Sequence, residues 1–153
     1  LRGAQEEVNQ EIFAEVTFHA AYEPQRMVRT KRWKYIRRFG ERGVPTLPNI
    51  DDGPTKDYLL EHGLREHPLD REMFFDLVYD SNETNNLIQD PRYQDILTDL
   101  RTRLADWMER TRDPLLDQAV VPFPENAVVN PAEADAPHDW ELITQEEHLH
   151  ARY

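Results

Sequence analysis

The feature that most constrains the fold is a run of large apolar residues between positions 93 and 108 that recur at helical spacing. Asp90 can cap a helix at this point, and Pro91 suits its first turn. The stripe predicts an amphipathic helix that ends at Asp113-Pro114. Burial of each such side chain stabilises the folded state by about 1.5–3 kcal/mol, before the opposing loss of conformational entropy is subtracted. The helix therefore needs an apolar partner. The stripe consists of Tyr93, Ile96, Leu97, Leu100, Leu104, Trp107 and Met108.

Four segments predict strands that could supply this partner, because they alternate or are rich in β-branched and aromatic residues. Lys31 and Arg32 alone separate the second from the third, which predicts a hairpin. The stretch Ala20–Gln25 contains Pro24 and is predicted as a loop. A short helix is expected at Lys56–His62, closed by Gly63. The predicted strands are Phe13–His19, Arg26–Thr30, Trp33–Phe39 and Met73–Tyr79.

Together these elements predict an α+β fold in which an antiparallel sheet of about four strands packs against one long C-terminal helix. The pattern fades after Leu116, where four prolines interrupt an acidic stretch with Trp140, Leu142 and Ile143 as its strong apolar anchors. We therefore predict one domain over residues 1–116 and an extended, Pro-rich acidic tail over 117–153 that is either disordered or laid over a surface.

Composition excludes several classes of function. The chain has 153 residues, no cysteine and a formal net charge of −12, which argues against a nucleic-acid binder and excludes thiolate chemistry. No apolar run approaches the roughly 18 residues needed to span a membrane. The single serine, Ser81, lies in a turn-like sequence and is not expected to be a nucleophile. His148 and His150 could ligate a metal, but a solvated tail is the favoured interpretation, so no catalytic and no metal-binding residue is predicted.

The charge is unevenly distributed along the chain. Residues 26–42 hold eight basic side chains and one acidic side chain, Glu41. This segment is either a solvated face of the sheet or a basic edge that holds an anionic ligand. The sequence leaves both open.

Three parts of the chain, namely its first predicted strands, its last predicted strand and its long predicted helix, resemble one family. Residues 12–19, 22–30 and 33–36 resemble the first strands of the sulfatase C-terminal subdomain, and Phe75–Leu87 is similar to its last strand and "D-P-x-E-x-x-N-L" turn, with Ser81 where many members have proline. The helix and the following Trp107–Pro114 are similar to the closing helix of the heparan N-sulfatase (sulfamidase) branch. The resemblance covers about residues 12–130.

The resemblance implies that this chain accompanies a catalytic domain of the same full-length protein, with an alkaline-phosphatase-like core. That domain would carry a formylglycine nucleophile and a calcium ion, and would act on a sulfated glycan. This chain lacks the C/S-x-P-x-R motif of the nucleophile, so no cofactor is expected within it. Secretion, or a periplasmic or lysosomal location, is implied by the resemblance, and a homo-oligomer is left open.

The resemblance also suggests that the subdomain closes one wall of the substrate pocket. His19, at the end of the first strand, matches the strand-end histidine of the sulfamidase-like pattern and is predicted to contact substrate; a structural histidine is the alternative. Arg26 could bind a carboxylate or sulfate, or form an ion pair with Glu23 or another carboxylate. Glu15 could accept a sugar hydroxyl or face solvent. Trp33 and Tyr35 fit core packing better than stacking on sugar rings.

Two functions follow from these observations. In the first, the chain is a non-catalytic part of a sulfatase that hydrolyses a sulfate ester or an N-sulfate. In the second, it is a free-standing module that binds an anionic glycan, through the basic segment, or a protein partner. The absence of an initiator methionine before Leu1 leads us to expect a longer protein.

Overall fold

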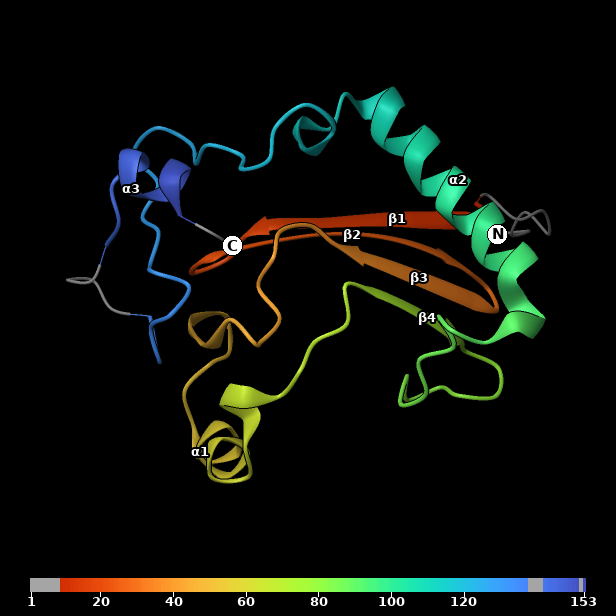
Figure 1. The fold of residues 1–153 in the computed structure, drawn as a ribbon, viewed down its shortest axis with the longest axis horizontal. Helices are drawn as coiled ribbons and strands as arrows, with labels where there is room; N and C mark the ends of the chain where they lie inside the picture. Colours follow the sequence, from red (N-terminus) through yellow and green to blue (C-terminus); the bar gives the residue numbers. More distant parts are fainter. Residues whose placement is uncertain (1–8, 138–141, 152) are drawn as a thin grey trace, which may run out of the picture. The chain divides into compact units, whose positions relative to one another are not determined.

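The computed structural model of the chain describes residues 9–137, 142–151 and 153, so the predicted anchor Trp140 lies outside the described residues. Four strands form a single antiparallel sheet in the order β1-β2-β3-β4. The predicted α+β class is confirmed (Figure 1). The strands are β1 (Glu11–Phe18), β2 (Tyr22–Thr30), β3 (Trp33–Arg38) and β4 (Glu72–Asp76); the helices are α1 (Pro54–Glu61), α2 (Gln94–Thr111) and α3 (Gln145–His150).

The predicted hairpin joins β2 to β3 through Lys31 and Arg32. This turn has no glycine, and the Thr30 side chain supports it instead. The Thr30 hydroxyl accepts a hydrogen bond from the backbone N–H of Trp33 at 2.9 Å and donates to the carbonyl of the same residue at 3.3 Å. A side chain that bonds locally to the backbone can stand in for the usual turn residues.

The predicted loop at Ala20–Gln25 is wrong for its last four residues, because β2 already begins at Tyr22 and contains Pro24. Proline cannot donate to a sheet, which is why it argued for a loop. The carbonyl of Pro24 accepts the N–H of Phe39 at 2.9 Å, and Phe39 lies just beyond the end of β3. The missing donor therefore falls where the ladder between the two strands ends.

The fourth strand is shorter than predicted and ends at Asp76 instead of Tyr79. The Asp76 carbonyl accepts the N–H groups of Tyr79 at 3.2 Å and Asp80 at 2.8 Å. The Asp76 carboxylate also accepts the N–H of Val78 at 3.2 Å. These bonds turn the chain out of the sheet. Within the sheet, Tyr35 of β3 pairs with Phe74 of β4.

Helix α2 confirms the predicted stripe. Its core side chains are Leu97, Leu100, Leu104 and Met108, all at most 2% exposed. Asp90 caps the preceding 3₁₀ turn, Pro91–Tyr93, by accepting the N–H of Arg92 at 2.9 Å. Trp107 stacks on Phe13 of β1 with ring centroids 5.2 Å apart, so the helix packs on the sheet as predicted (Figure 1).

The predicted end of this helix is two residues late. The helix stops at Thr111 because Arg112 adopts a left-handed conformation with φ 54°. Asp113 then caps the following turn by accepting the N–H of Leu115 at 3.0 Å.

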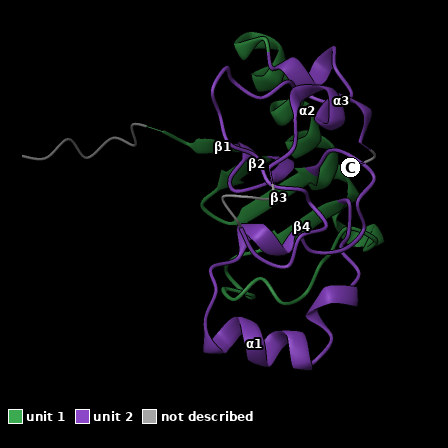
Figure 2. Cartoon of the chain, turned by 90° about the vertical axis from the view of Figure 1, so that its left-hand side faces the viewer, with its two compact units in different colours: residues 1–15, 26–37, 72–112 green, residues 16–25, 38–71, 113–153 purple. Residues whose placement is uncertain are grey.

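Contacts group the chain into two compact units (Figure 2). Unit 1 consists of residues 1–15, 26–37 and 72–112, and unit 2 of residues 16–25, 38–71 and 113–153. The predicted division at residue 116 stays a prediction about the boundary of a subdomain. Residues 113–153 contribute the helix α3, opened by a capping box between Thr144 and Glu147, and several buried side chains.

Across the described part of the chain, no helix combines the length and the apolar character required to cross a bilayer.

Candidate functional site

The first predicted site residue, His19, lies in unit 2 directly after β1, and its side chain is exposed. Two residues later the chain is fully buried, with Ala21 at 0% exposure. The backbone N–H of His19 donates to the Ala21 carbonyl at 3.2 Å. A buried backbone needs hydrogen-bond partners, and a loop residue supplies them here.

That residue is Asn49, at the end of the 3₁₀ turn Leu47–Asn49. Its Oδ1 accepts the N–H of Ala21 at 2.8 Å, while its Nδ2 donates to the Ala21 carbonyl at 3.3 Å and to Oε2 of Glu23 at 2.9 Å. The other oxygen of Glu23 accepts from Arg38 at 2.7 Å. We call this arrangement of Asn49, Glu23 and Arg38 the amide clamp, because it ties the loop that carries His19 to the start of β2.

The other side of the same loop is held by the C-terminal segment. The Ala20 carbonyl accepts the N–H of Asn130 at 2.9 Å, and Ala21 forms a parallel bridge with Asn130. Segments far apart in sequence therefore brace the loop, and the exposed His19 stands on a fixed backbone. Fixed support of this kind is what a binding residue requires.

A cluster of aromatic side chains lies behind the loop. Phe18 and Tyr22 both contact His148, with ring centroids 5.5 and 4.9 Å apart, and Tyr22 also packs on Tyr153 at 4.5 Å. The hydroxyl of Tyr22 accepts the N–H of Val121 at 3.1 Å. This cluster forms the core of unit 2 next to the His19 loop.

For His148 the favoured interpretation as part of a solvated tail is wrong, because its side chain is buried by aromatic neighbours. It is 0% exposed, and its Nε2 lies 2.7 Å from the carbonyl of Val121 while its Nδ1 lies 2.6 Å from the hydroxyl of Tyr153. A carbonyl can only accept, so Nε2 carries a hydrogen and donates to Val121; in the neutral form of the ring, Nδ1 then accepts from the Tyr153 hydroxyl. Burial raises the pKa of Tyr153 to about 12. The helical spacing of α3 was too short a signal to reveal this buried histidine.

Neither ring nitrogen of His148 is available to a metal in this arrangement. Within residues 9–137, 142–151 and 153, no group of three or more His, Cys, Asp or Glu side chains has a geometry that could hold a metal ion.

The other two predicted site residues lie together in unit 1. Arg26 of β2 is 1% exposed, and its Nε lies 3.6 Å from Oε2 of Glu15 in β1, whose side chain is 61% exposed. Arg26 thus forms an ion pair as the alternative interpretation supposed, but with Glu15 instead of Glu23. The carboxylate of Glu15 is the part of this pair that solvent or a ligand can reach.

The basic segment 26–42 is extensively paired with carboxylates. In unit 1, Arg32 binds Asp76 with its NH2 group 2.7 Å from Oδ2, and Lys34 lies 2.6 Å from Glu83. The hydrogen bonds from Arg32 hold the pKa of Asp76 below its usual range. Paired cations of this kind offer little net charge to an anionic ligand. The structure therefore favours a neutralised sheet over a basic edge.

The aromatic residues of β3 pack against neighbouring side chains, as expected; Tyr35 is buried and Trp33 is half-buried. Tyr35 is 1% exposed and donates a hydrogen bond to Glu72, which also binds Arg101 of α2 at 3.1 Å. Trp33 stacks on Phe74 with ring centroids 5.3 Å apart. Neither is placed as a flat platform for a sugar.

Comparison with known proteins gives this arrangement a context. No sequence profile of a known protein family matches the chain. It is 31% identical over 125 residues to an ulvan-active sulfatase from Formosa agariphila, and the match covers 78% of this chain and 25% of that protein.

Two solved structures share its fold. A 2-O GAG sulfatase aligns with a TM-score of 0.50 and 21% identity, over 90% of this chain and 24% of its own. A protein from Bacteroides thetaiotaomicron, provisionally assigned as a sulfatase, aligns with a TM-score of 0.51 and 23% identity, over 88% and 24%. The chain thus spans about a quarter of the length of these relatives and is similar to a small part of a sulfatase, while the finer placement in the heparan N-sulfatase branch stays a prediction.

Proposed function

We propose that the chain is the C-terminal subdomain of a sulfatase, and that it forms one wall of a pocket in which a sulfate ester or N-sulfate of a glycan is hydrolysed. The observation that carries this proposal is the 31% identity to an ulvan-active sulfatase over 125 residues of the chain. In this proposal the chain alone would be non-catalytic, because it lacks the C/S-x-P-x-R motif of the nucleophile.

The braced loop after β1 supports a role in binding. His19 is exposed on a backbone that is held by Asn49 and Asn130. A neutral imidazole can donate one hydrogen bond and accept another, which suits a sulfate oxygen or a sugar hydroxyl. In this proposal His19 contacts substrate directly.

Glu15 and Arg26 would act as a pair. The exposed carboxylate of Glu15 could accept a hydrogen bond from a sugar hydroxyl, while the ion pair with the buried Arg26 orients that carboxylate. Direct contact between Arg26 and a sulfate would require Glu15 to move away.

We assign the formylglycine and the calcium ion to a catalytic domain of the same full-length protein. Among the described residues nothing fits either group, since there is no cysteine, and Ser81 lies in the turn after β4 without the C/S-x-P-x-R context. This catalytic domain is the main partner that we propose. A secreted, periplasmic or lysosomal location belongs to the same proposal.

The outer face of β1 supports a missing neighbour. Ile12 and Val16 alternate with Phe13 and therefore lie on the side of the strand away from its contact with Trp107. They are 50% and 43% exposed. Apolar side chains left open on an edge strand are typical of a surface that another layer covers. That layer would be the catalytic domain, and a second copy of the chain is the other candidate.

The test is a sulfatase assay on the protein expressed from its complete coding sequence. We expect release of inorganic sulfate from sulfated oligosaccharides, and a C/S-x-P-x-R motif upstream of Leu1. His19→Ala should raise KM or lower kcat by about tenfold, the loss of one hydrogen bond to a charged group. His67→Ala, which removes an exposed loop histidine, is the matched control. If neither kcat nor KM differs between the two variants, His19 does not contact substrate.

A further inference from the structure

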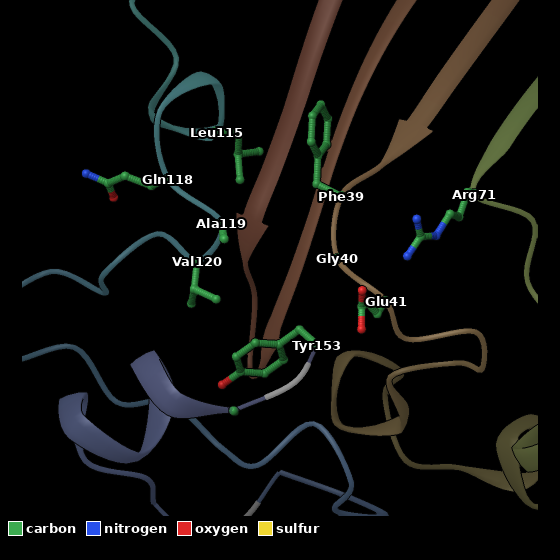
Figure 3. Close-up of a pocket in the computed structure, with 10 residues that line it drawn as sticks. Phe39, Gly40, Glu41, Arg71, Leu115, Gln118, Ala119, Val120 and Tyr153 are labelled. Atoms are coloured by element: carbon green, nitrogen blue, oxygen red, sulfur yellow. The ribbon is translucent and has the colours of Figure 1, made fainter.

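Unit 2 contains a cavity of about 440 Å³. This volume lies within the range of about 300–1,000 Å³ that is usual for small-molecule sites. Figure 3 shows its walls, which come from the residues after β3, the residue before β4 and the C-terminal segment. The side chains that matter below are Phe39, Glu41, Arg71, Leu115, Val120 and Tyr153.

The walls are held in place by hydrogen bonds and close packing. Tyr153 is 7% exposed, and its hydroxyl binds the buried His148. The N–H of Phe39 donates to Pro24, and the carbonyl of Arg71 accepts the N–H of Arg38 at 2.8 Å. Gly40 has φ +98°, and a Cβ at this position would lie 3.0 Å from the Tyr153 carbonyl oxygen. The backbone along these sides of the cavity is therefore fixed, with residue 40 pressed against the C-terminal segment.

Two side chains of opposite charge line this cavity without forming an ion pair. The other arginines of unit 2 that the structure describes each bind a carboxylate: Arg38 binds Glu23, Arg42 binds Glu133 and Arg65 binds Asp135. Among the described residues, Arg71 has no such partner within 4 Å, and Glu41 makes no side-chain ion pair. In Figure 3 the guanidinium of Arg71 and the carboxylate of Glu41 lie on the same side of the cavity.

The opposite wall is mostly apolar. Leu115 and Val120 lie across from Arg71 with the polar Gln118 beside them, and the Tyr153 ring closes one end (Figure 3). A ligand that fills this space must offer C–H surface to these side chains and hydrogen-bonding groups to the charged pair. A purely apolar ligand would desolvate both charges without compensation. A ligand with several anionic groups would be repelled by Glu41.

We propose that this cavity binds one pyranose ring of a saccharide. The ring's C–H face packs on Tyr153 and Val120, a hydroxyl or single sulfate accepts hydrogen bonds from Arg71, and another hydroxyl donates to Glu41. The choice of a saccharide rests in part on the proposed function, in which the parent protein acts on a glycan. The site is separate from the His19 loop and would hold a further sugar of the chain or an independent saccharide.

The test is isothermal titration calorimetry on the protein expressed from its complete coding sequence, with a neutral oligosaccharide and its monosulfated counterpart as probes. We expect saturable binding of at least one probe. Arg71→Ala should weaken that binding by about tenfold or more, the usual effect of deleting a charged hydrogen-bond donor. Arg71→Lys keeps the charge without the planar fork and should give a smaller loss. Tighter binding of the sulfated probe would identify the group at Arg71 as sulfate, and equal binding would identify it as a hydroxyl.

Arg65→Ala is the matched control, because it removes an arginine of the same unit that does not line the cavity. Equal affinity of the Arg71→Ala and Arg65→Ala proteins, or no saturable binding by the unsubstituted protein, would overturn the proposal. Circular dichroism of each variant separates a binding loss from unfolding. Sulfate release by the unsubstituted protein is measured in parallel, so the proposed sulfatase function and the saccharide site can fail independently.

Discussion

Replacement of Asn49 tests whether the amide clamp holds the loop that carries His19. In Asn49→Ala the N–H of Ala21, on a residue with 0% exposure, loses its 2.8 Å partner. A buried donor left unpaired costs about 1–3 kcal/mol. The bond to Glu23 is also lost, although Glu23 keeps Arg38. We therefore expect the free energy of unfolding to fall by about 2–4 kcal/mol.

A second variant at the same site separates hydrogen bonding from space filling. Asn49→Asp keeps the oxygen that accepts from Ala21 but places another acceptor where Nδ2 donates to the Ala21 carbonyl and to Glu23. Repulsion there should make it at least as unstable as Asn49→Ala at pH 7. Asn82→Ala, at an exposed turn position, is the control and should change stability by less than about 0.5 kcal/mol.

The measurement is urea unfolding followed by tryptophan fluorescence. If Asn49→Asp were as stable as the unsubstituted protein, the reasoning would be refuted, because the Asn49 amide would then only fill space and its hydrogen bonds would not stabilise the loop. In the complete protein, Asn49→Ala should also raise KM for a sulfated oligosaccharide, since a loosened loop no longer holds His19 in one place.

Three further predictions concern the two units. Leu104→Ala, at a position 2% exposed on α2, should cost about 2–5 kcal/mol in urea unfolding, whereas the exposed Asp106→Ala on the same helix should not. Arg32 lowers the pKa of Asp76, so the stability from this pair is present above the ordinary aspartate pKa of about 3.9 and is lost as the pH falls through the lower folded-state value. Asp76→Asn should flatten the fall in stability between pH 5 and pH 2; an unchanged slope would contradict this assignment. Gly40→Ala should lose at least about 1–2 kcal/mol through its left-handed backbone, while Gly43→Ala, with no atom within 4 Å of the added Cβ, should lose less than half of that.

The sequence predicted the elements that are defined by contacts between neighbouring residues. The apolar stripe of α2 and the two-residue separation of β2 from β3 could be recognised because helices and hairpins place nearby residues at regular spacings. The end of β4 was misjudged because Asp76 has the sequence context of a strand, and only its bonds to Val78 and Tyr79 show that the chain turns.

Side chains that act through distant partners could not be predicted. The clamp residue Asn49 lies 28 positions from Ala21, in a stretch that reads simply as a loop rich in proline and glycine. His148 is buried by Phe18 and Tyr22, more than a hundred positions earlier in the sequence. The acidic, proline-rich segment around His148 has no regular spacing of apolar residues from which the burial of this histidine could be inferred. His19 was predicted only through resemblance to a family, because no local pattern marks it as a binding residue.

Each unit is built from three segments that are separated in the sequence, and this affects the order in which the chain can fold. The β2–β3 hairpin can form as soon as it is synthesised, because its contacts are local. Unit 2 cannot close until residues 113–153 arrive, since Tyr22 packs on Tyr153 and Ala21 pairs with Asn130. Such long sequence separations slow folding. In a ribosome-bound chain that stops before residue 113, Tyr22 and Ala21 would lack these partners, and the first part of unit 2 would be open to proteases and chaperones.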